Sequence, residues 1–190
     1  MVSFPYPPSN MNGVLKQPLS LYGTKISDKG LRELVALKNL RHLHLTGLKI
    51  TDEGVKHLTT HKELQTLNLT LVPMTNNGMK EVAKLKKLRS LKLSTTKLSD
   101  AGLAEIRELE HLESLQVDRN KITDESAKVL SGFKKLKTLN LGGTAVTDEG
   151  LKELTALKAL EYLQVDGSKA TATGVRELKK SLPKLRVIGP

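Results

Sequence analysis

A single pattern recurs every 24 residues along most of this chain, and it limits the possible folds more than any other feature. The pattern is clearest around Leu139 and Leu141, which alternate with polar residues as in a strand with one buried face. Thr147 and Asp148 then look like a helix start, ahead of leucines at helical spacing that extend to Leu157. Self-similarity at this period predicts stacked strand–helix units that bury their apolar faces against one another.

The glycines mark the period directly, because they occupy the same place in successive units. They are Gly30, Gly54, Gly78, Gly102, Gly150 and Gly174, with Ser126 in the one gap. We infer that this row lets each helix start pack closely against its neighbour. The repetition predicts a capping segment or tail at 1–14, seven repeats at 15–182 and a C-terminal capping strand at 183–190. The open end of a stack needs a cover, and we expect Phe4 and Tyr6 to help cover the first one.

Side-chain alternation within each unit separates a core face from an exposed face. Leu43 and Leu45 are expected to point inward, whereas His42 and His44 point outward from the same strand. A hydroxyl residue precedes every predicted helix and is expected to cap it by accepting from free amides. These residues are Ser27, Thr51, Thr75, Ser99, Thr123, Thr147 and Thr171. In most units an Asp follows, where its charge suits the helix N-terminus, and a basic residue four positions later predicts a solvated ion pair.

The pattern L-x-x-L-x-L, as at 40–45, resembles the leucine-rich repeat family. The continuation at 50–55 is similar to the I-T-D-x-G-L signature of its ribonuclease-inhibitor-like subclass, which occurs in F-box-associated repeats and in bacterial proteins with 24-residue units. The resemblance implies an α/β solenoid, a right-handed superhelix with a parallel sheet on the concave face and helices on the convex face. It also implies a module that binds proteins or peptides and has no shared catalytic residues. The family's usual Cys or Asn position is filled by Thr24, Thr96, Asn120, Thr144 and Ser168, whereas Leu48 and Val72 depart from it.

Several kinds of chemistry are excluded or disfavoured by the sequence. The chain has no Cys, which excludes disulfides, thiolate metal sites and cysteine nucleophiles. Phosphate-loop, H-E-x-x-H and G-x-S-x-G motifs are absent, and the aligned Asp residues belong to different helices. The stretch at 118–129 does not satisfy a calcium loop, because Thr123 replaces its Gly and Val129 its closing Glu. We therefore expect no enzymatic activity, catalytic residue or cofactor.

Two histidine pairs are the remaining candidates for metal binding. His42 and His44 share one strand face, but the equivalent positions in the next strand are Thr66 and Asn68, which are poor metal ligands. A polar patch facing a partner is therefore preferred to a metal site. His57 and His61 are four residues apart, yet His61 occupies a row that is otherwise apolar. We expect it to be a partly buried structural residue.

The formal net charge of +11 suggests an anionic partner, but its meaning depends on where the basic residues lie in the repeat. One row of cations lies on the helices and a second lies at helix C-termini, where positive charge is stabilising. A third row, the lysine rim, lies in the strand-to-helix loops and comprises Lys25, Lys49, Lys97, Lys121 and Lys169. No aromatic platform for bases interleaves with these rows, which disfavours nucleic acid. Electrostatic binding of nucleic acid or an anionic surface through the rim is an alternative function.

The concave sheet face is the preferred candidate site, because its outward positions vary from unit to unit whereas structural positions repeat. The candidate partner-binding residues are Tyr22, His42, His44, Thr66, Asn68, Arg89, Lys92, Gln116, Asp118, Arg119, Asn140, Tyr162, Gln164 and Asp166. The first half of this surface is predicted to be basic and the second acidic, which would orient a charged partner. Leu71, Val72 and Pro73 break the pattern at the edge and are expected to add a small apolar contact. A solvated sheet face without a ligand is the other interpretation.

The ends of the sequence and its hydropathy bear on location. The segment 1–10 has neither a basic n-region nor an apolar h-region, so it does not resemble a signal peptide. No apolar run has the length of a membrane span. We expect a cytoplasmic monomer that binds a protein or peptide, unless the sequence is a piece of a longer protein. A further alternative is the targeting fragment of a larger adaptor or effector.

Overall fold

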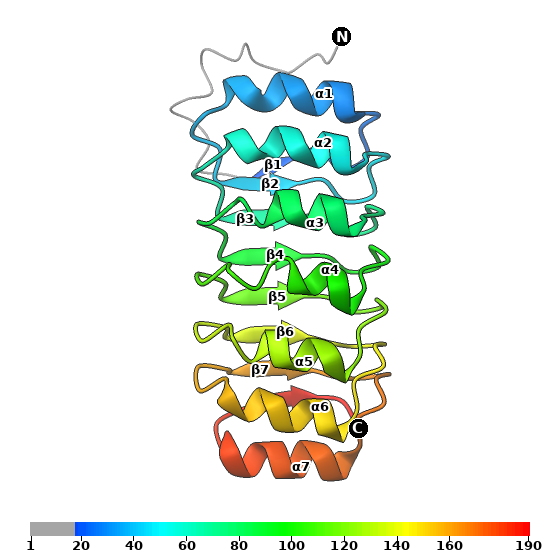
Figure 1. The fold of residues 1–190 in the computed structure, drawn as a ribbon, viewed down its shortest axis with the longest axis vertical. Coiled ribbons are helices and arrows are strands. Elements are labelled where there is room, and N and C mark those ends of the chain that lie inside the picture. The colour runs from blue at the N-terminus through cyan, green and yellow to red at the C-terminus, as the bar shows by residue number, and fades with distance from the viewer. Residues whose placement is uncertain (1–17) are drawn as a thin grey trace.

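The computed structural model describes residues 18–190, in which eight strands form one parallel sheet in chain order (Figure 1). The predicted segment 1–14, with Phe4 and Tyr6, lies outside the described residues. The strands are β1 (Leu19–Ser20), β2 (His42–His44), β3 (Thr66–Asn68), β4 (Ser90–Lys92), β5 (Ser114–Gln116), β6 (Thr138–Asn140), β7 (Tyr162–Gln164) and β8 (Arg186–Ile188). Each pairing joins residues 24 positions apart, as Leu43 with Leu67 and Leu91 with Leu115. Equivalent side chains are therefore stacked in rows across the sheet.

A helix follows each of the first seven strands and returns the chain to the start of the next. The helices are α1 (Asp28–Glu33), α2 (Asp52–His57), α3 (Asn76–Val82), α4 (Asp100–Ala104), α5 (Asp124–Leu130), α6 (Asp148–Glu153) and α7 (Ala172–Ser181). Short 3₁₀ turns at Leu34–Ala36, Leu58–Thr60 and Leu154–Ala156 extend three of them. Most helices are shorter than the leucine spacing predicts. Leu157, for example, lies in the loop after the 3₁₀ turn, although it is still buried.

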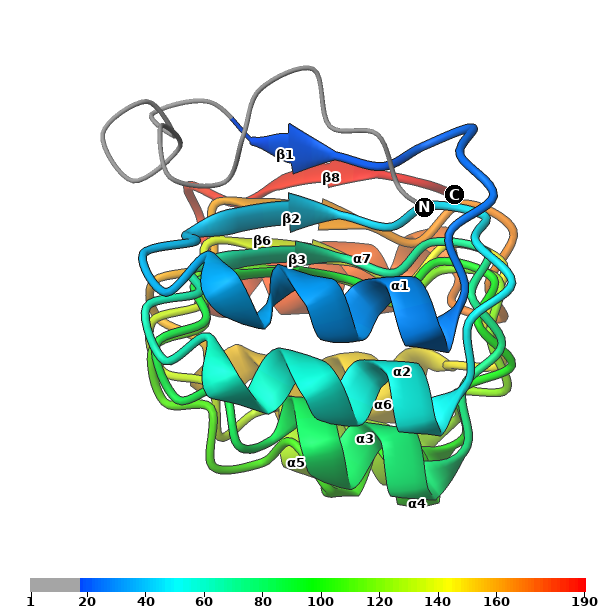
Figure 2. The same cartoon turned by 90° about the horizontal axis from the view of Figure 1, so that it is seen from above.

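The stack is curved, with the sheet on its inner side. Viewed along the stack, the end strands β1 and β8 lie furthest toward the open sheet face, and the central helices α4 and α5 lie furthest away on the other side (Figure 2). This arrangement confirms the predicted α/β leucine-rich repeat solenoid, with the parallel sheet on the concave face and the helices outside.

The core between sheet and helices is aliphatic and continuous. The central residue of each strand from β2 to β7 is a buried leucine, and the helices contribute further buried residues such as Val55 and Leu58. Phe133 is the one aromatic in this core among the described residues. Leu48 and Val72 are also buried, so these loops pack with apolar side chains where Thr96 and Asn120 hydrogen bond to backbone groups. The prediction that Val72 adds an apolar contact at the edge is therefore wrong, because its side chain belongs to the core.

His61 is more buried than predicted, with 1% of its surface exposed. Its Nδ1 lies 3.2 Å from the Leu37 carbonyl oxygen, so Nδ1 carries the proton and donates it. Nε2 then has a lone pair with no hydrogen-bonding partner among the described residues. Burial lowers the pKa of His61, while the hydrogen bond to Leu37 acts in the opposite direction. The residue is a structural histidine that carries an unsatisfied buried acceptor.

The helix starts are joined by an aspartate ladder that the sequence pattern did not predict. In five steps an Asp in one repeat accepts hydrogen bonds from both the backbone N–H and the hydroxyl of the capping Thr in the next. The pairs are Asp28–Thr51, Asp52–Thr75, Asp100–Thr123, Asp124–Thr147 and Asp148–Thr171. The bonds from Thr147 to Asp124 measure 2.8 and 2.7 Å. The ladder therefore ties each helix start to its neighbour.

The ladder explains the capping row, the glycine row and the lysine partners together. The capping hydroxyls from Thr51 onward accept from helix amides as predicted, whereas Ser27 does not. A Cβ added at Gly150 would collide with the Asp124 carboxylate, which confirms that this glycine permits close packing. The predicted ion pair between Asp and the cation four residues later is wrong. Lys152 instead lies 2.6 Å from Glu149, since the Asp148 oxygens bind Thr171.

One rung of the ladder is weak. Asn76 replaces Asp there, and its side-chain oxygen lies 3.5 Å from the Ser99 hydroxyl. At the following step of the stack, Ser126 occupies the glycine row, and its hydroxyl donates an additional hydrogen bond to Asp100.

Within residues 18–190, no helix is both long and apolar enough to cross a membrane.

Candidate functional site: the concave sheet face

The outward side chains of β2 to β7 form a continuous strip along the concave face. In β2 to β6 a buried leucine lies between two partly exposed side chains. β7 keeps the alternation but exposes its first residue further. Nine of the predicted residues lie on this strip, namely His42, His44, Thr66, Asn68, Lys92, Gln116, Asn140, Tyr162 and Gln164. The parallel register places them in adjacent rows, so one ligand could contact several strands.

The other predicted residues lie at the two ends of the strands. Tyr22, Asp118 and Asp166 each follow a strand by two residues, whereas Arg89 immediately precedes β4. Arg119 follows β5 by three residues and lies in the exit loop. These five therefore flank the strip at its edges.

The predicted division into a basic and an acidic half is interrupted at Glu113. This carboxylate forms ion pairs with Arg89 and, at 2.9 Å, with Lys137, which the sequence analysis did not single out. Hydrogen bonds from Lys137 and then Arg89 lower the pKa of Glu113, and the same bond raises the pKa of Lys137. Arg89, Glu113 and Lys137 occupy equivalent positions in successive repeats, so positive and negative charges alternate along this edge. Arg89 is thus partly neutralised.

The histidines on β2 occupy different environments. His42 Nδ1 lies 3.0 Å from the Thr66 hydroxyl on β3, which fixes the ring against the sheet. Burial lowers the pKa of His44, and the positive charges of Lys92 and His42 lower it further. No group of three or more potential metal ligands occurs in the described part of the chain. The lowered pKa therefore favours the neutral form of the His44 ring within the strip.

Some predicted residues already have partners within the sheet. The Ser94 hydroxyl donates to Asp118 at 2.7 Å, and the side chains of Asn68 and Asn140 accept from backbone N–H groups two residues later. These bonds hold the strip in a defined shape. The side chains of Lys92 and Gln116 take no part in the hydrogen bonds on this face of the described chain and are available to a ligand.

Two exposed tyrosines lie near opposite ends of the sheet. Tyr22 is 71% exposed and Tyr162 is 45% exposed. Arg186 on β8 lies 5.6 Å from the centroid of the Tyr162 ring and donates to its hydroxyl at 3.3 Å. This cation–π contact orients the ring. Arg186 was not identified from the sequence, because its role depends on pairing between β7 and β8.

The exit loops show a second departure from the repeat. Gly23, Gly47, Gly143 and Gly167 occupy one left-handed backbone position, but the three central repeats place Leu71, Thr95 and Arg119 there, with φ of 62°, 56° and 55°. A side chain in this conformation costs roughly 1 kcal/mol or more, and a β-branched residue such as Thr95 is the least suited to it. Backbone hydrogen bonds to the following repeat hold all three. The central repeats therefore carry side chains on the exit edge that glycine would omit.

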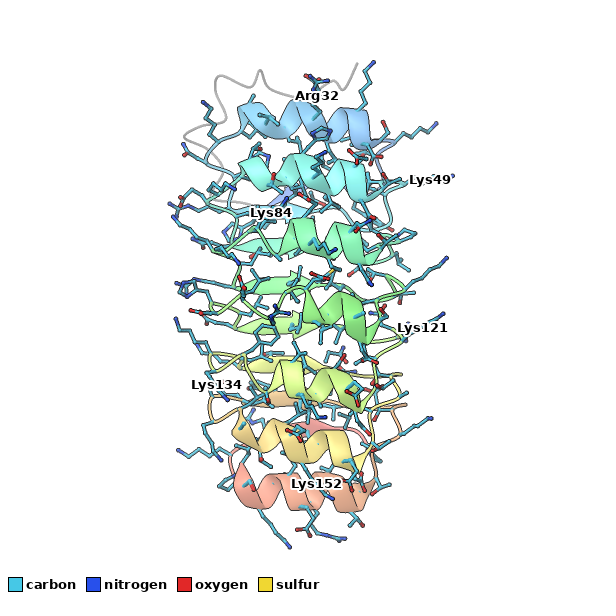
Figure 3. The ribbon with its side chains drawn as sticks, in the orientation of Figure 1. Arg32, Lys49, Lys84, Lys121, Lys134 and Lys152 are labelled. Carbon is cyan, nitrogen blue, oxygen red and sulfur yellow. The ribbon has the colours of Figure 1, made fainter. Side chains whose placement is uncertain are left out.

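The lysine rim lies along that same edge, beyond the strip. All five of its lysines are exposed. Lys49 and Lys121 extend away from the fold where the strands lead into the helices, whereas Lys134 lies at the opposite edge (Figure 3). The ion pairs of the described chain use other lysines, such as Lys87 and Lys137. The rim thus keeps its positive charge available.

Comparisons with known proteins agree with this geometry. Two leucine-rich repeat family models match the chain, at residues 110–169 and 36–58. Internalin C2 of Listeria monocytogenes superposes with a TM-score of 0.75 and is 26% identical, and the match covers 95% of this chain and 72% of that one. These findings support the resemblance of this chain to the leucine-rich repeat family.

A second internalin of the same organism, inlF, has a TM-score of 0.66 and 22% identity and shows the fold alone. The match covers 95% of this chain but 56% of inlF, so this chain spans little more than half of that protein. The comparison with curated proteins finds no match.

Proposed function

We propose that this chain is a non-enzymatic module that binds a protein or peptide on the concave face of its sheet. The observation that carries the proposal is that the outward sheet positions differ between repeats while the helix starts repeat. The aspartate ladder joins five of the six pairs of neighbouring helix starts in the described chain, so its residues recur. The outward residues of the sheet do not support stacking in this way and are free to match a particular partner.

Three properties of the strip support binding of a macromolecule. The strip is presented on a continuous parallel sheet, so little ordering of the backbone is required when a ligand binds. It contains available polar groups, such as Lys92 and Gln116, between the exposed rings of Tyr22 and Tyr162. Tyrosine and arginine are common among residues that dominate binding energies, because they bury a large area while keeping a polar group.

The finer family assignment is also a proposal. Residues 50–55 support the I-T-D-x-G-L subclass with 24-residue units, since the Thr caps a helix and the Asp forms a rung of the ladder. Leucine-rich repeats of this kind act by presenting a surface, which agrees with the expectation of no catalytic residue and no cofactor.

The proposal is tested by isolating partners from the source cell and measuring their affinity for alanine variants. Arg89→Ala, Lys92→Ala, Arg119→Ala and Tyr162→Ala should weaken binding without unfolding the chain. We expect the largest loss, about tenfold to a hundredfold, at Tyr162 or Lys92, and a smaller one at Arg89, which Glu113 partly neutralises. Lys62→Ala on the opposite edge is the control for altered charge. Unchanged affinity in all four variants would overturn the site.

A further inference from the structure

We propose a second binding surface on the lysine rim, which takes an extended acidic peptide carrying one apolar side chain. This surface is separate from the concave strip, and it would exist whether or not the strip binds a partner. It is built from a shallow hollow between the second and third repeats and from the lysines on either side of it.

The hollow lies where the lysine row is interrupted. The third repeat carries Pro73 at the rim position, and the space beside it measures about 530 Å³. Its apolar lining includes Leu48, Ile50, Leu71 and Pro73, and Lys49 also lines it. Leu71 is 54% exposed, which is unusual for a leucine in this chain. An exposed apolar surface therefore occupies one of the two gaps in the row of lysines, the other being at Ala145.

The loop that borders the hollow is bonded to the next repeat. The N–H of Leu71 donates to the Ser94 carbonyl at 3.0 Å, and the N–H of Met74 donates to the Thr96 carbonyl at 3.1 Å, so the next repeat fixes this loop. Asp52 is the one carboxylate in the lining, and its oxygens accept from Thr75. Both of its oxygens are therefore engaged by the ladder.

Lysines on both sides of the hollow determine the charge of the occupant. Lys25 and Lys49 precede it and Lys97 and Lys121 follow it, one repeat apart within each pair, and all are exposed. Carboxylates on each side of an apolar anchor would match this order of positive, apolar and positive surface. Neighbouring strands are about 4.8 Å apart, so Lys49 and Lys97 are separated by roughly 10 Å at the sheet. An extended peptide covers that distance in about three residues.

A peptide fits this surface better than a nucleic acid does. Among the described residues Phe133 lies in the core and Tyr162 on β7, so Tyr22, which follows β1 by two residues, is the one Phe or Tyr ring near the rim. A run of bases would therefore find no series of rings to stack on along the rim. The hollow offers apolar contact to an aliphatic side chain, which a nucleotide backbone lacks. The apolar gap thus distinguishes this surface from a general anion-binding face.

The test uses the full chain and three fluorescent probes in an anisotropy titration. The probes are a glutamate-rich 12-residue peptide with a central Leu, the same peptide with a central Ser, and a single-stranded oligonucleotide of equal charge. The Leu peptide should bind about tenfold more tightly than the Ser peptide, as expected for partial burial of one leucine. Equal affinity of the two peptides, or tighter binding of the oligonucleotide, would overturn the proposal.

Matched variants locate the binding site. Lys49→Gln with Lys97→Gln should weaken the Leu peptide about tenfold, whereas the same change at Lys62 and Lys158 on the opposite edge should have less than a twofold effect. Leu71→Gly should remove the preference for Leu over Ser without unfolding, since glycine occupies this position in other repeats. Tyr162→Ala should not affect any probe. Equal losses at the two lysine pairs, or an intact preference in Leu71→Gly, would contradict the assignment.

Discussion

The helix starts and the concave sheet face are made by the same repeat but carry different information. At the helix starts, a capping hydroxyl, an Asp and a Gly recur because each Asp must reach the Thr of the next repeat. On the sheet, the buried leucines recur, but the side chains between them change from histidine to lysine, glutamine and tyrosine. Geometry that recurs along the stack thus indicates a structural position, and variation on the same scaffold is the feature on which the proposed binding site rests.

The first and largest predicted effect concerns the glycine row. Gly150→Val should lower the free energy of unfolding by about 3 kcal/mol, because the new side chain would displace the Asp124 carboxylate and overpack Val146. Gly150→Ser should cost much less, since Ser126 shows that a hydroxyl in this row can donate to the ladder. Urea unfolding of the two variants measures the difference. Equal stabilities would mean that close packing at the helix starts is not required.

The second prediction removes one rung of the ladder. Asp124→Ala should cost about 2 kcal/mol, because it leaves the backbone N–H and the hydroxyl of Thr147 without their charged acceptor. Asn76→Asp makes the opposite change and should add about 0.5–1 kcal/mol by strengthening the weak contact with Ser99. Chemical denaturation at pH 7 measures both. A neutral Asp124→Ala would show that the ladder contributes little to the stack.

The third prediction concerns His61, the polar exception in an otherwise apolar row. His61→Leu should add about 1 kcal/mol, because it removes a buried acceptor that has no partner. Since burial holds the pKa of folded His61 below its usual 6.5, the unfolded chain takes up the proton first. The wild type should therefore lose stability as pH falls below about 6.5, until the folded pKa is passed, and His61→Leu should lose less over this range. Parallel pH dependences would contradict the burial argument.

The fourth and smallest effect lies on the exit edge of the sheet. Thr95→Gly should stabilise the chain by about 0.5–1 kcal/mol, because glycine accepts the left-handed backbone that Thr95 adopts at a cost. Gly143→Ala makes the reverse change at the equivalent position two repeats further along and should destabilise by a similar amount. Thermal unfolding of the pair measures the difference. A destabilised Thr95→Gly would mean that the Thr95 side chain supports the fold.

The period made most of the scaffold predictable from sequence. Leucines such as Leu43 and Leu67 had to stack because equivalent residues recur at one spacing, and the capping role of Thr51 follows from its place before a helix. The partner of Asp28 could not be predicted, because it lies 23 residues away and depends on how two repeats are offset. Helix lengths were overestimated, because buried residues such as Leu157 also occur beyond the helix end.

Fewer features of the candidate site than of the scaffold could be predicted from the sequence. Alternation correctly places residues such as Lys92 and Gln116 on the outward strip, but it does not reveal which side chains already have partners. Lys137 was missed because its importance arises from its ion pair with Glu113 in the neighbouring repeat. The exposure of Leu71 depends on a left-handed backbone that the next repeat holds in place. Contacts across repeats are therefore what the one-dimensional pattern omits.

The central claim is that the sheet strip serves recognition and contributes little to the fold. The most direct test is to measure unfolding free energy and partner affinity together in the triple variant Lys92→Ala, Gln116→Ala and Tyr162→Ala. We predict a free energy of unfolding within about 1 kcal/mol of the wild type and an affinity at least about a hundredfold lower. A triple variant that keeps its affinity within twofold, or that loses stability as the ladder variants do, would contradict the account.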